Sequence, residues 1–247
     1  MLHVACYSSA KRFADVEPAT RGREMKAPRI QLPTTLKDLI YDNIKMLFNS
    51  GQIHPDEIYS AKYFAEMLGV SRTPVREALL QLASEGFMVA VKGRGFKTKT
   101  FSEKEISDFF ETRKMIEGYV IERLVYELTK SDFSQLGIHL KTMRKTAKKE
   151  SAQDFIEADK CFHMALIKRY GNHLLESIVE NIRSLISIFG SKALSYEGRY
   201  QEVVNEHEMV LKALYDKEKD KAVAAMNYHL DTTERYLLEV PATATKR

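Results

Sequence analysis

The chain has 247 residues, 44% of them hydrophobic and 29% charged, with a formal net charge of +4 at pH 7. This length suits one large domain or two modest ones, each with its own core. No segment approaches the roughly 20 consecutive apolar residues that span a bilayer, and the N-terminal sequence lacks the apolar stretch of a secretory signal. We therefore expect a cytoplasmic protein with no membrane contact, in which Cys6 and Cys161 form no disulfide framework.

The first part of the chain predicts a leader followed by two helices. Residues 1–30 show no sustained periodicity and are expected to form a flexible leader. Apolar residues at helical spacing predict a helix over 35–51, and a second, shorter helix is expected over 60–68. Gly69 stands where a helix C-cap residue is favoured.

A third helix follows after three residues, in the segment SRTPVREALLQLASEG. Ser71 can cap it, and Pro74 falls in the first turn, where its missing N–H is tolerated. Arg72, Thr73 and Arg76 gather at the N-terminal end of the polar face. A helix that enters the DNA major groove contacts bases from this end. The opposite, apolar face consists of Val75, Ala78, Leu79 and Leu82.

A hairpin is predicted next, because two β-prone runs, 87–91 and 96–100, flank the glycine-containing basic tip at 92–95. Residues 60–99 carry seven Lys or Arg against three Glu. A positive field of this kind favours binding to phosphates, and an ordinary solvated basic surface fits the same charge balance. The charge alone does not separate these two interpretations.

The order helix, helix, turn, helix, hairpin is that of a winged helix-turn-helix, expected here over residues 31–101. The sequence LGVSRTPVREALLQLASEGF, followed by VKGRGF, closely resembles the DNA-binding signature of the GntR family of bacterial regulators. The resemblance covers about sixty residues. It implies that Arg72, Thr73 and Arg76 contact a double-stranded operator and that Gly93 lies against the minor groove.

Lys62 departs from the family pattern. The family has Arg in the phrase SERELA, whereas this chain has SAKYFA. Lysine keeps the charge but loses the forked guanidinium, so we expect Lys62 to contact phosphate rather than bases.

The remainder of the chain predicts an all-α domain over residues 102–240, followed by a tail over 241–247. It begins with a capping box, Ser102 to Glu105, and no strand pattern competes with the helices. The fold class is thus mainly α, a winged helix-turn-helix followed by a helical bundle. Helices are predicted near 103–130, 132–150, 152–170, 173–190, 198–217 and 219–239, with breaks around Ser131, Ser151, Gly171 and Gly190–Gly198.

Polar residues interrupt three apolar stripes of this bundle. Asp159 and His163 lie one turn apart on one stripe, His207 interrupts a second and His229 a third. Buried polar side chains need partners, so these four are expected to share one. One carboxylate and three imidazoles are suitable ligands for a divalent transition metal, although a hydrogen-bonded core histidine is the commoner role for any one of them.

The same four residues resemble the metal-binding residues of the FCD ligand domain found in one GntR subfamily, the FadR subfamily. The likeness spans about residues 102–240 and implies a metal at Asp159, His163, His207 and His229. Zinc is favoured, with nickel, iron and manganese as alternatives.

An open metal site suits a sensor, and we expect a small carboxylate effector there. Arg113, inside an apolar stripe, is a candidate to pair with the carboxylate, although it can equally bridge to Glu117 or to solvent. Asn181 is a weaker candidate for the effector site.

The sequence therefore predicts a homodimeric transcription factor, not an enzyme, whose affinity for a palindromic operator changes when an effector binds. Two alternative functions remain: hydrolysis of a substrate at the metal, and architectural DNA binding that does not depend on DNA sequence. Hydrolysis needs a general base, and Glu206 and Glu208, which flank His207, are expected to point away from it.

Overall fold

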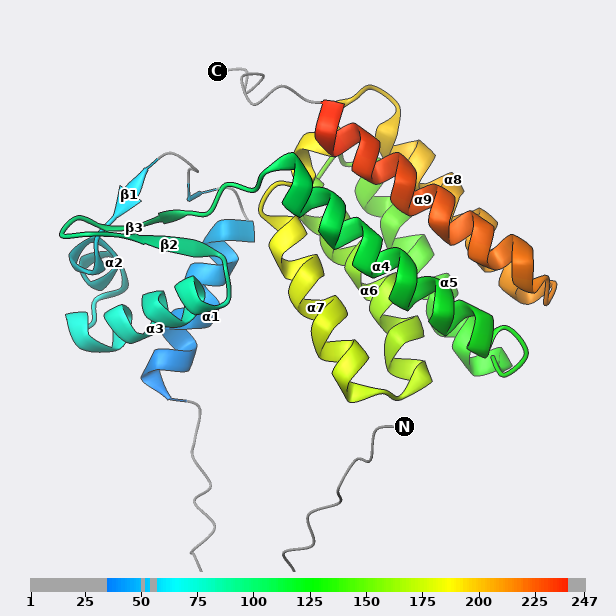
Figure 1. Cartoon of the computed structure of the whole chain (residues 1–247), viewed down its shortest axis with the longest axis horizontal. Helices are drawn as coiled ribbons and strands as arrows, with labels where there is room; N and C mark the ends of the chain where they lie inside the picture. Colours follow the sequence, from blue (N-terminus) through cyan, green and yellow to red (C-terminus); the bar gives the residue numbers. More distant parts are fainter. Residues whose placement is uncertain (1–34, 50–51, 54–56, 240–247) are drawn as a thin grey trace, which may run out of the picture. The chain divides into compact units, whose positions relative to one another are not determined.

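The computed structural model describes residues 35–49, 52–53 and 57–239. The N-terminal part contains a three-stranded sheet. Figure 1 shows this sheet together with helices, and a set of long helices in the rest of the chain. The fold class is therefore as predicted. The expected leader over 1–30, the tail over 241–247 and Cys6 lie outside the described residues.

The N-terminal part is a winged helix-turn-helix. Its strands form an antiparallel sheet in the order β1, β3, β2, and the two-residue strand β1, which the sequence did not indicate, pairs with the edge of β3 away from β2. The elements are α1 (Leu36–Asn49), β1 (Ile58–Tyr59), α2 (Ala61–Leu68), α3 (Arg72–Ser84), β2 (Met88–Val91) and β3 (Gly95–Thr98).

Local capping explains where these short helices begin and end. The Ser60 hydroxyl accepts the Tyr63 N–H at 3.1 Å at the start of α2, and Gly69 ends it as predicted. Ser71 stands at the N-cap of α3, but its side chain makes no capping bond, so that part of the prediction is wrong. Fully buried side chains from α1, α2 and α3 meet beneath the sheet: Ile44, Phe64, Val75, Leu79 and Leu82.

The rest of the described chain is helical, as predicted. The helices are α4 (Glu103–Leu124), α5 (Lys130–Ala147), α6 (Ala152–Tyr170), α7 (His173–Ser187), the 3₁₀ helix η1 (Gly190–Ser195), α8 (Arg199–Tyr215) and α9 (Lys219–Glu239). The predicted capping box is present: Ser102 Oγ accepts the Glu105 N–H at 3.2 Å, and a Glu105 carboxylate oxygen accepts the Ser102 N–H at 2.9 Å.

Predicted boundaries of α5 and α7 differ from the structure by two or three residues, the 3₁₀ helix η1 lies inside the break predicted around Gly190–Gly198, and one boundary is wrong by more. The first helix of the bundle ends at Leu124 rather than at residue 130, and a turn over 125–127 follows. The break comes before Ser131 because Thr129 forms a second capping box with Asp132, whose carboxylate accepts the Thr129 N–H at 2.7 Å.

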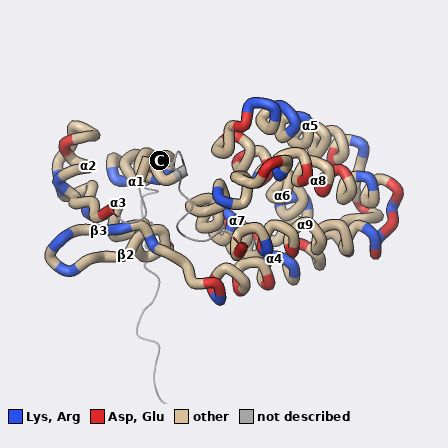
Figure 2. Tube along the Cα trace, turned by 90° about the horizontal axis from the view of Figure 1, so that it is seen from above, with Lys and Arg blue, Asp and Glu red and all other residues tan. Residues whose placement is uncertain are grey.

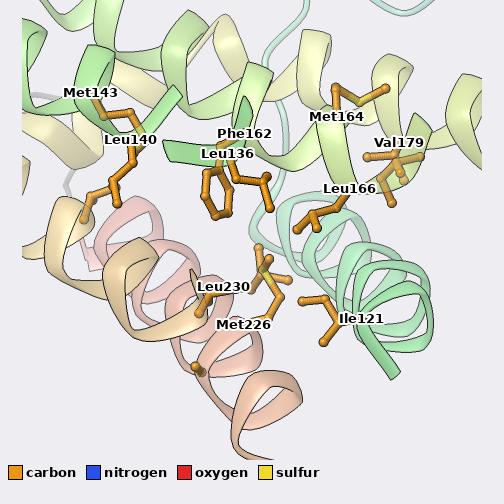
Figure 3. Packing of buried hydrophobic residues seen from close by; sticks show 14 of the residues in the cluster. Ile121, Leu136, Leu140, Met143, Phe162, Met164, Leu166, Val179, Met226 and Leu230 are labelled. Carbon is orange, nitrogen blue, oxygen red and sulfur yellow. The ribbon is translucent and has the colours of Figure 1, made fainter. Parts of the chain in front are cut away.

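The bundle packs around one apolar core, in which α4 packs on α9, α9 on α8 and α5 on α6. Figure 3 shows how Phe162 and Leu166 of α6, Leu230 of α9 and Ile121 of α4 fill the space between the ribbons. Among the helices of the described ranges, none is both long and apolar enough to cross a membrane.

Two glycine-to-alanine substitutions should have opposite effects on stability. Gly95 in β3 has φ +136°, and a Cβ there would lie 2.4 Å from the Tyr59 carbonyl oxygen of β1, so Gly95→Ala should lower the free energy of unfolding by at least about 2 kcal/mol. Gly137 in α5 has no atom within 4 Å of such a Cβ, so Gly137→Ala should raise it by about 0.5–1 kcal/mol. Urea denaturation followed by circular dichroism measures both, and a neutral Gly95→Ala would contradict the strained close approach.

Candidate metal centre and DNA-binding surface

The residues predicted to contact DNA lie on exposed positions of the winged helix-turn-helix. Arg72, Thr73 and Arg76 occupy the first turns of α3, and all three are exposed. Gly93 lies at the tip between β2 and β3 with φ +69°, and this hairpin tip carries basic side chains on both sides of the glycine (Figure 2). Lys62 is exposed on α2, 3.7 Å from Glu66, a surface pair too weak to hold it in place.

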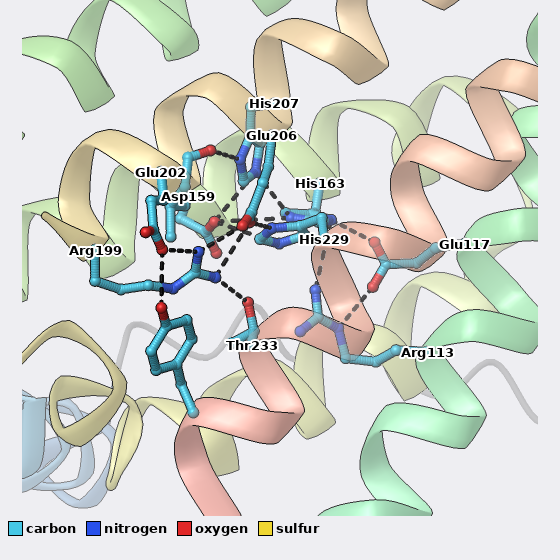
Figure 4. Close-up of polar contacts among 12 residues, drawn as sticks. Arg113, Glu117, Asp159, His163, Arg199, Glu202, Glu206, His207, His229 and Thr233 are labelled. Carbon is cyan, nitrogen blue, oxygen red and sulfur yellow. Dashed lines mark hydrogen bonds and ion pairs between the residues drawn. The ribbon is translucent and has the colours of Figure 1, made fainter. Parts of the chain in front are cut away.

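The four predicted metal ligands come together inside the bundle. Asp159 and His163 lie on α6, His207 on α8 and His229 on α9, and their ligand atoms are within 4.8 Å of one another. His207 Nε2 lies 3.1 Å from His163 Nε2 and 3.1 Å from Asp159 Oδ1, and His229 Nε2 lies 4.0 Å from the same oxygen. Figure 4 shows the three rings converging on the aspartate. This is the only such group of His, Cys, Asp and Glu in the described ranges.

Each imidazole is held from behind through Nδ1, which leaves Nε2 facing the centre. The Nδ1–H of His207 donates to the Val203 carbonyl at 2.8 Å. His163 Nδ1 contacts a carboxylate oxygen of Glu117, and His229 Nδ1 lies 2.7 Å from Glu206 Oε2. An acceptor behind Nδ1 favours the neutral tautomer with an unprotonated Nε2, which is the form that binds a metal.

Burial also favours the metal-binding protonation states. It lowers the pKa of His229 to about 3, with a further contribution from the neighbouring His207, and it lowers the pKa of His163. For Asp159, burial alone would raise the pKa, but the charge of Arg183 and hydrogen bonds to His163 and His207 outweigh it and hold the pKa well below its usual range. At neutral pH the site therefore presents neutral imidazoles at His163 and His229 and a carboxylate at Asp159.

Sequence reasoning missed the buried roles of Glu206, Arg183 and Arg199 around this centre, whereas the bridge from Arg113 to Glu117 was one of the alternatives it left open and is present. Glu206 was expected to point away from the site and instead is buried, where it contacts His229 and pairs with Arg199. Glu117 pairs with Arg113, their Nε and Oε1 atoms 2.7 Å apart, and contacts His163. Glu206 lies between Asn205 and His207, so no local pattern indicated that it is buried.

A cavity of about 80 Å³ borders the centre. Its wall includes Asp159, His229, Arg113 and Arg183, together with the apolar side chains of Phe155, Ile156 and Leu194. Arg113, a predicted effector residue, does line this cavity, but its guanidinium is already bonded to Glu117.

Asn181, the second predicted effector residue, is exposed on α7 and is not among the lining residues. Arg183, two positions further along α7, does line the cavity. The structure therefore gives Asn181 no contact with the cavity, since its side chain leaves the opposite side of the helix.

Two family models match this chain. Residues 36–97 match "Bacterial regulatory proteins, gntR family", and residues 108–232 match the FCD domain. Among curated proteins, the chain is 29% identical over 194 residues to the gluconate operon transcriptional repressor of Bacillus subtilis, covering 75% of this chain and 77% of the relative. It is 26% identical over 178 residues to the transcriptional repressor RspR of Escherichia coli, covering 72% and 78%.

Solved structures of similar proteins have the same fold. The Escherichia coli protein McbR/YncC superposes with a TM-score of 0.73 at 21% identity, covering 83% of this chain and 98% of that one. A GntR regulator from Rhodococcus sp. RHA1 gives a TM-score of 0.70 at 18% identity, with coverage of 83% and 98%.

Glu206→Gln should weaken metal binding without removing a ligand. The amide keeps the size of the side chain but replaces the charged acceptor behind His229, so we expect metal affinity to fall about 10- to 100-fold. Competition with a chromophoric chelator measures it. Glu208→Gln is the matched control on the same helix, because Glu208 is exposed and pairs with Arg144. Equal affinities for the two variants would contradict a supporting role for Glu206.

Proposed function

The chain belongs to the gntR family of bacterial regulatory proteins and carries an FCD domain, and from this we propose that a small carboxylate, bound beside a divalent metal in the helical domain, controls its affinity for operator DNA. The relatives are named transcriptional repressors. This chain is likewise a transcriptional regulator and not an enzyme. We place its action in the cytoplasm, where the operator is.

The donor set carries the metal part of the proposal. Three Nε2 atoms and one carboxylate oxygen converge, and each imidazole has an acceptor behind Nδ1. Asp159, His163, His207 and His229 would hold the ion, with zinc favoured and nickel, iron and manganese as alternatives. When bound, the ion supplies a Lewis-acidic position for a carboxylate oxygen.

The adjoining cavity carries the effector part. It borders both Asp159 and His229, and its wall contains buried guanidinium groups beside apolar side chains. Guanidinium groups favour carboxylates, and the apolar wall suits a short carbon chain. Arg113 lies on this wall and is proposed to pair with the effector carboxylate while its Nε atom stays bonded to Glu117.

Operator control requires two coupled sites. We expect two copies of the chain to bind a palindrome as a homodimer, because a second reading head adds both affinity and specificity. Arg72, Thr73 and Arg76 would contact bases from α3, Gly93 would approach the minor groove and Lys62 would contact phosphate. The effector changes operator affinity by the difference between its affinities for the DNA-binding and non-binding conformations.

Replacing Arg72 or Arg76 with alanine should reduce operator preference. Each base-contacting guanidinium contributes on the order of 1–3 kcal/mol, so the affinity ratio of a selected operator to scrambled duplex should fall about 5- to 150-fold. Lys62→Ala should instead weaken binding to both duplexes equally. The slope of log affinity against log salt concentration should become shallower by about one. Fluorescence anisotropy measures both, with Arg144→Ala on α5 as the control. An unchanged ratio for Arg72→Ala and Arg76→Ala would rule out the proposed DNA-binding surface.

Removing the metal should weaken effector binding. Isothermal titration of a panel of short carboxylates, with gluconate included because of the relatives, is compared between metal-loaded and chelator-stripped protein. We expect at least about a tenfold loss of affinity on stripping, with intact helicity by circular dichroism. Identical binding to both forms would contradict the metal-bridged effector.

A further inference from the structure

The buried charges around the cavity balance one another before any ion is bound. Arg113 pairs with Glu117, Arg183 with Asp159 and Arg199 with Glu206. Nearer the surface, Lys160 pairs with Glu180, and the half-exposed Glu202 contacts Arg199 at 3.4 Å. The three buried guanidinium groups are therefore matched by three carboxylates.

A divalent cation at Asp159 and the three histidines would leave two positive charges without a partner. Burying uncompensated charge is strongly unfavourable, so the neutral surroundings favour a ligand that brings negative charge with it. A monocarboxylate would neutralise half of the excess. A ligand with two anionic groups would neutralise it fully.

Arg183 supplies a place for the second group. Its Nη2 contacts Asp159, while Nε and Nη1 have no hydrogen-bond partner among the residues that the structure describes, and its side chain is only 5% exposed. A buried guanidinium nitrogen without an acceptor is costly, and Arg183 is one of the residues that line the cavity.

The other two buried arginines have fewer unused hydrogen-bond donors. Arg113 uses Nε on Glu117, and its Nη2 lies 3.5 Å from His163. Arg199 uses both terminal nitrogens on Glu206, Glu202 and Thr233 and leaves only Nε without a partner in the described ranges.

We propose that the effector is a short dianion, such as a dicarboxylate, with one acidic group at the metal and the other on the unused donors of Arg183. This inference rests on the proposed function and assigns Arg183 as the residue that selects a doubly charged acid. The cavity of about 80 Å³ holds several water-sized groups, which suits a short chain between the two acids. Because Arg183 also contacts Asp159, the second acidic group would lie next to a metal ligand.

The test compares acids of matched carbon number on the full-length, zinc-loaded protein. Isothermal titration with malonate against propionate, and succinate against butyrate, gives a dianion-to-monoanion affinity ratio. We expect a ratio of at least about 30 for the unaltered chain and a ratio near one for Arg183→Gln. Arg169→Gln on α6, whose arginine pairs with Asp132 near the surface, should keep the ratio of the unaltered chain.

Zinc content, measured by elemental mass spectrometry, separates selectivity from damage to the metal centre. If Arg183→Gln holds less zinc, Arg183→Lys replaces it in the test, because lysine retains a positive charge beside Asp159. The dianion-to-monoanion affinity ratio of Arg183→Lys should still fall at least about fivefold, because lysine lacks the additional donors of the guanidinium. Equal affinities for dianions and monoanions in the unaltered chain would overturn this inference and leave the proposed function standing. A high ratio that persists in zinc-loaded Arg183→Gln and Arg183→Lys would overturn the role of Arg183. If no acid binds with or without zinc, the effector part of the proposed function fails together with this inference.

Discussion

A buried imidazole has two nitrogens, and both need partners where water is excluded. At this centre one nitrogen of each of the three histidines is satisfied by the protein itself: Glu117 for His163, a backbone carbonyl of the same helix for His207, and Glu206 for His229. The remaining nitrogens face one another and Asp159. Three acceptor nitrogens and a carboxylate cannot satisfy each other, so the arrangement is stable with a cation or protons between them.

The glutamates behind these histidines depend in turn on arginines. Arg113 and Arg199 are buried and bonded to Glu117 and Glu206, so each histidine that has a glutamate behind it is supported by an ion pair from the far side. A buried ion pair is weak evidence for stability, because desolvation of both charges offsets their attraction. Here each ion pair orients a glutamate carboxylate, and that carboxylate in turn determines which nitrogen of the histidine ring carries the proton.

The cluster of Asp159, His163, His207 and His229 was predictable from the sequence because several polar residues inside apolar helical stripes are expected to share a partner. The supporting residues were not. Glu206 directly precedes His207, and two neighbours on a helix point about 100° apart, so one of them is normally exposed. Here α8 packs against both α9 and α5, and its buried face is wide enough to include both residues. Which faces of a helix are covered is a tertiary property that periodicity alone does not determine.

The same distinction explains the rest of the fold. Local signals, such as Gly69 after α2 and the capping box at Ser102, predicted helix ends correctly. Strand β1 has only two residues and exists through its pairing with β3, so no local pattern indicated it. Arg183 is the same case within the site: on α7 it is one more charged residue, and only the approach of Asp159 from α6 makes it a buried partner with unused donors. The effector selectivity proposed for Arg183 therefore depends on helix packing, whereas the four clustered His and Asp residues are already visible in the helical repeat.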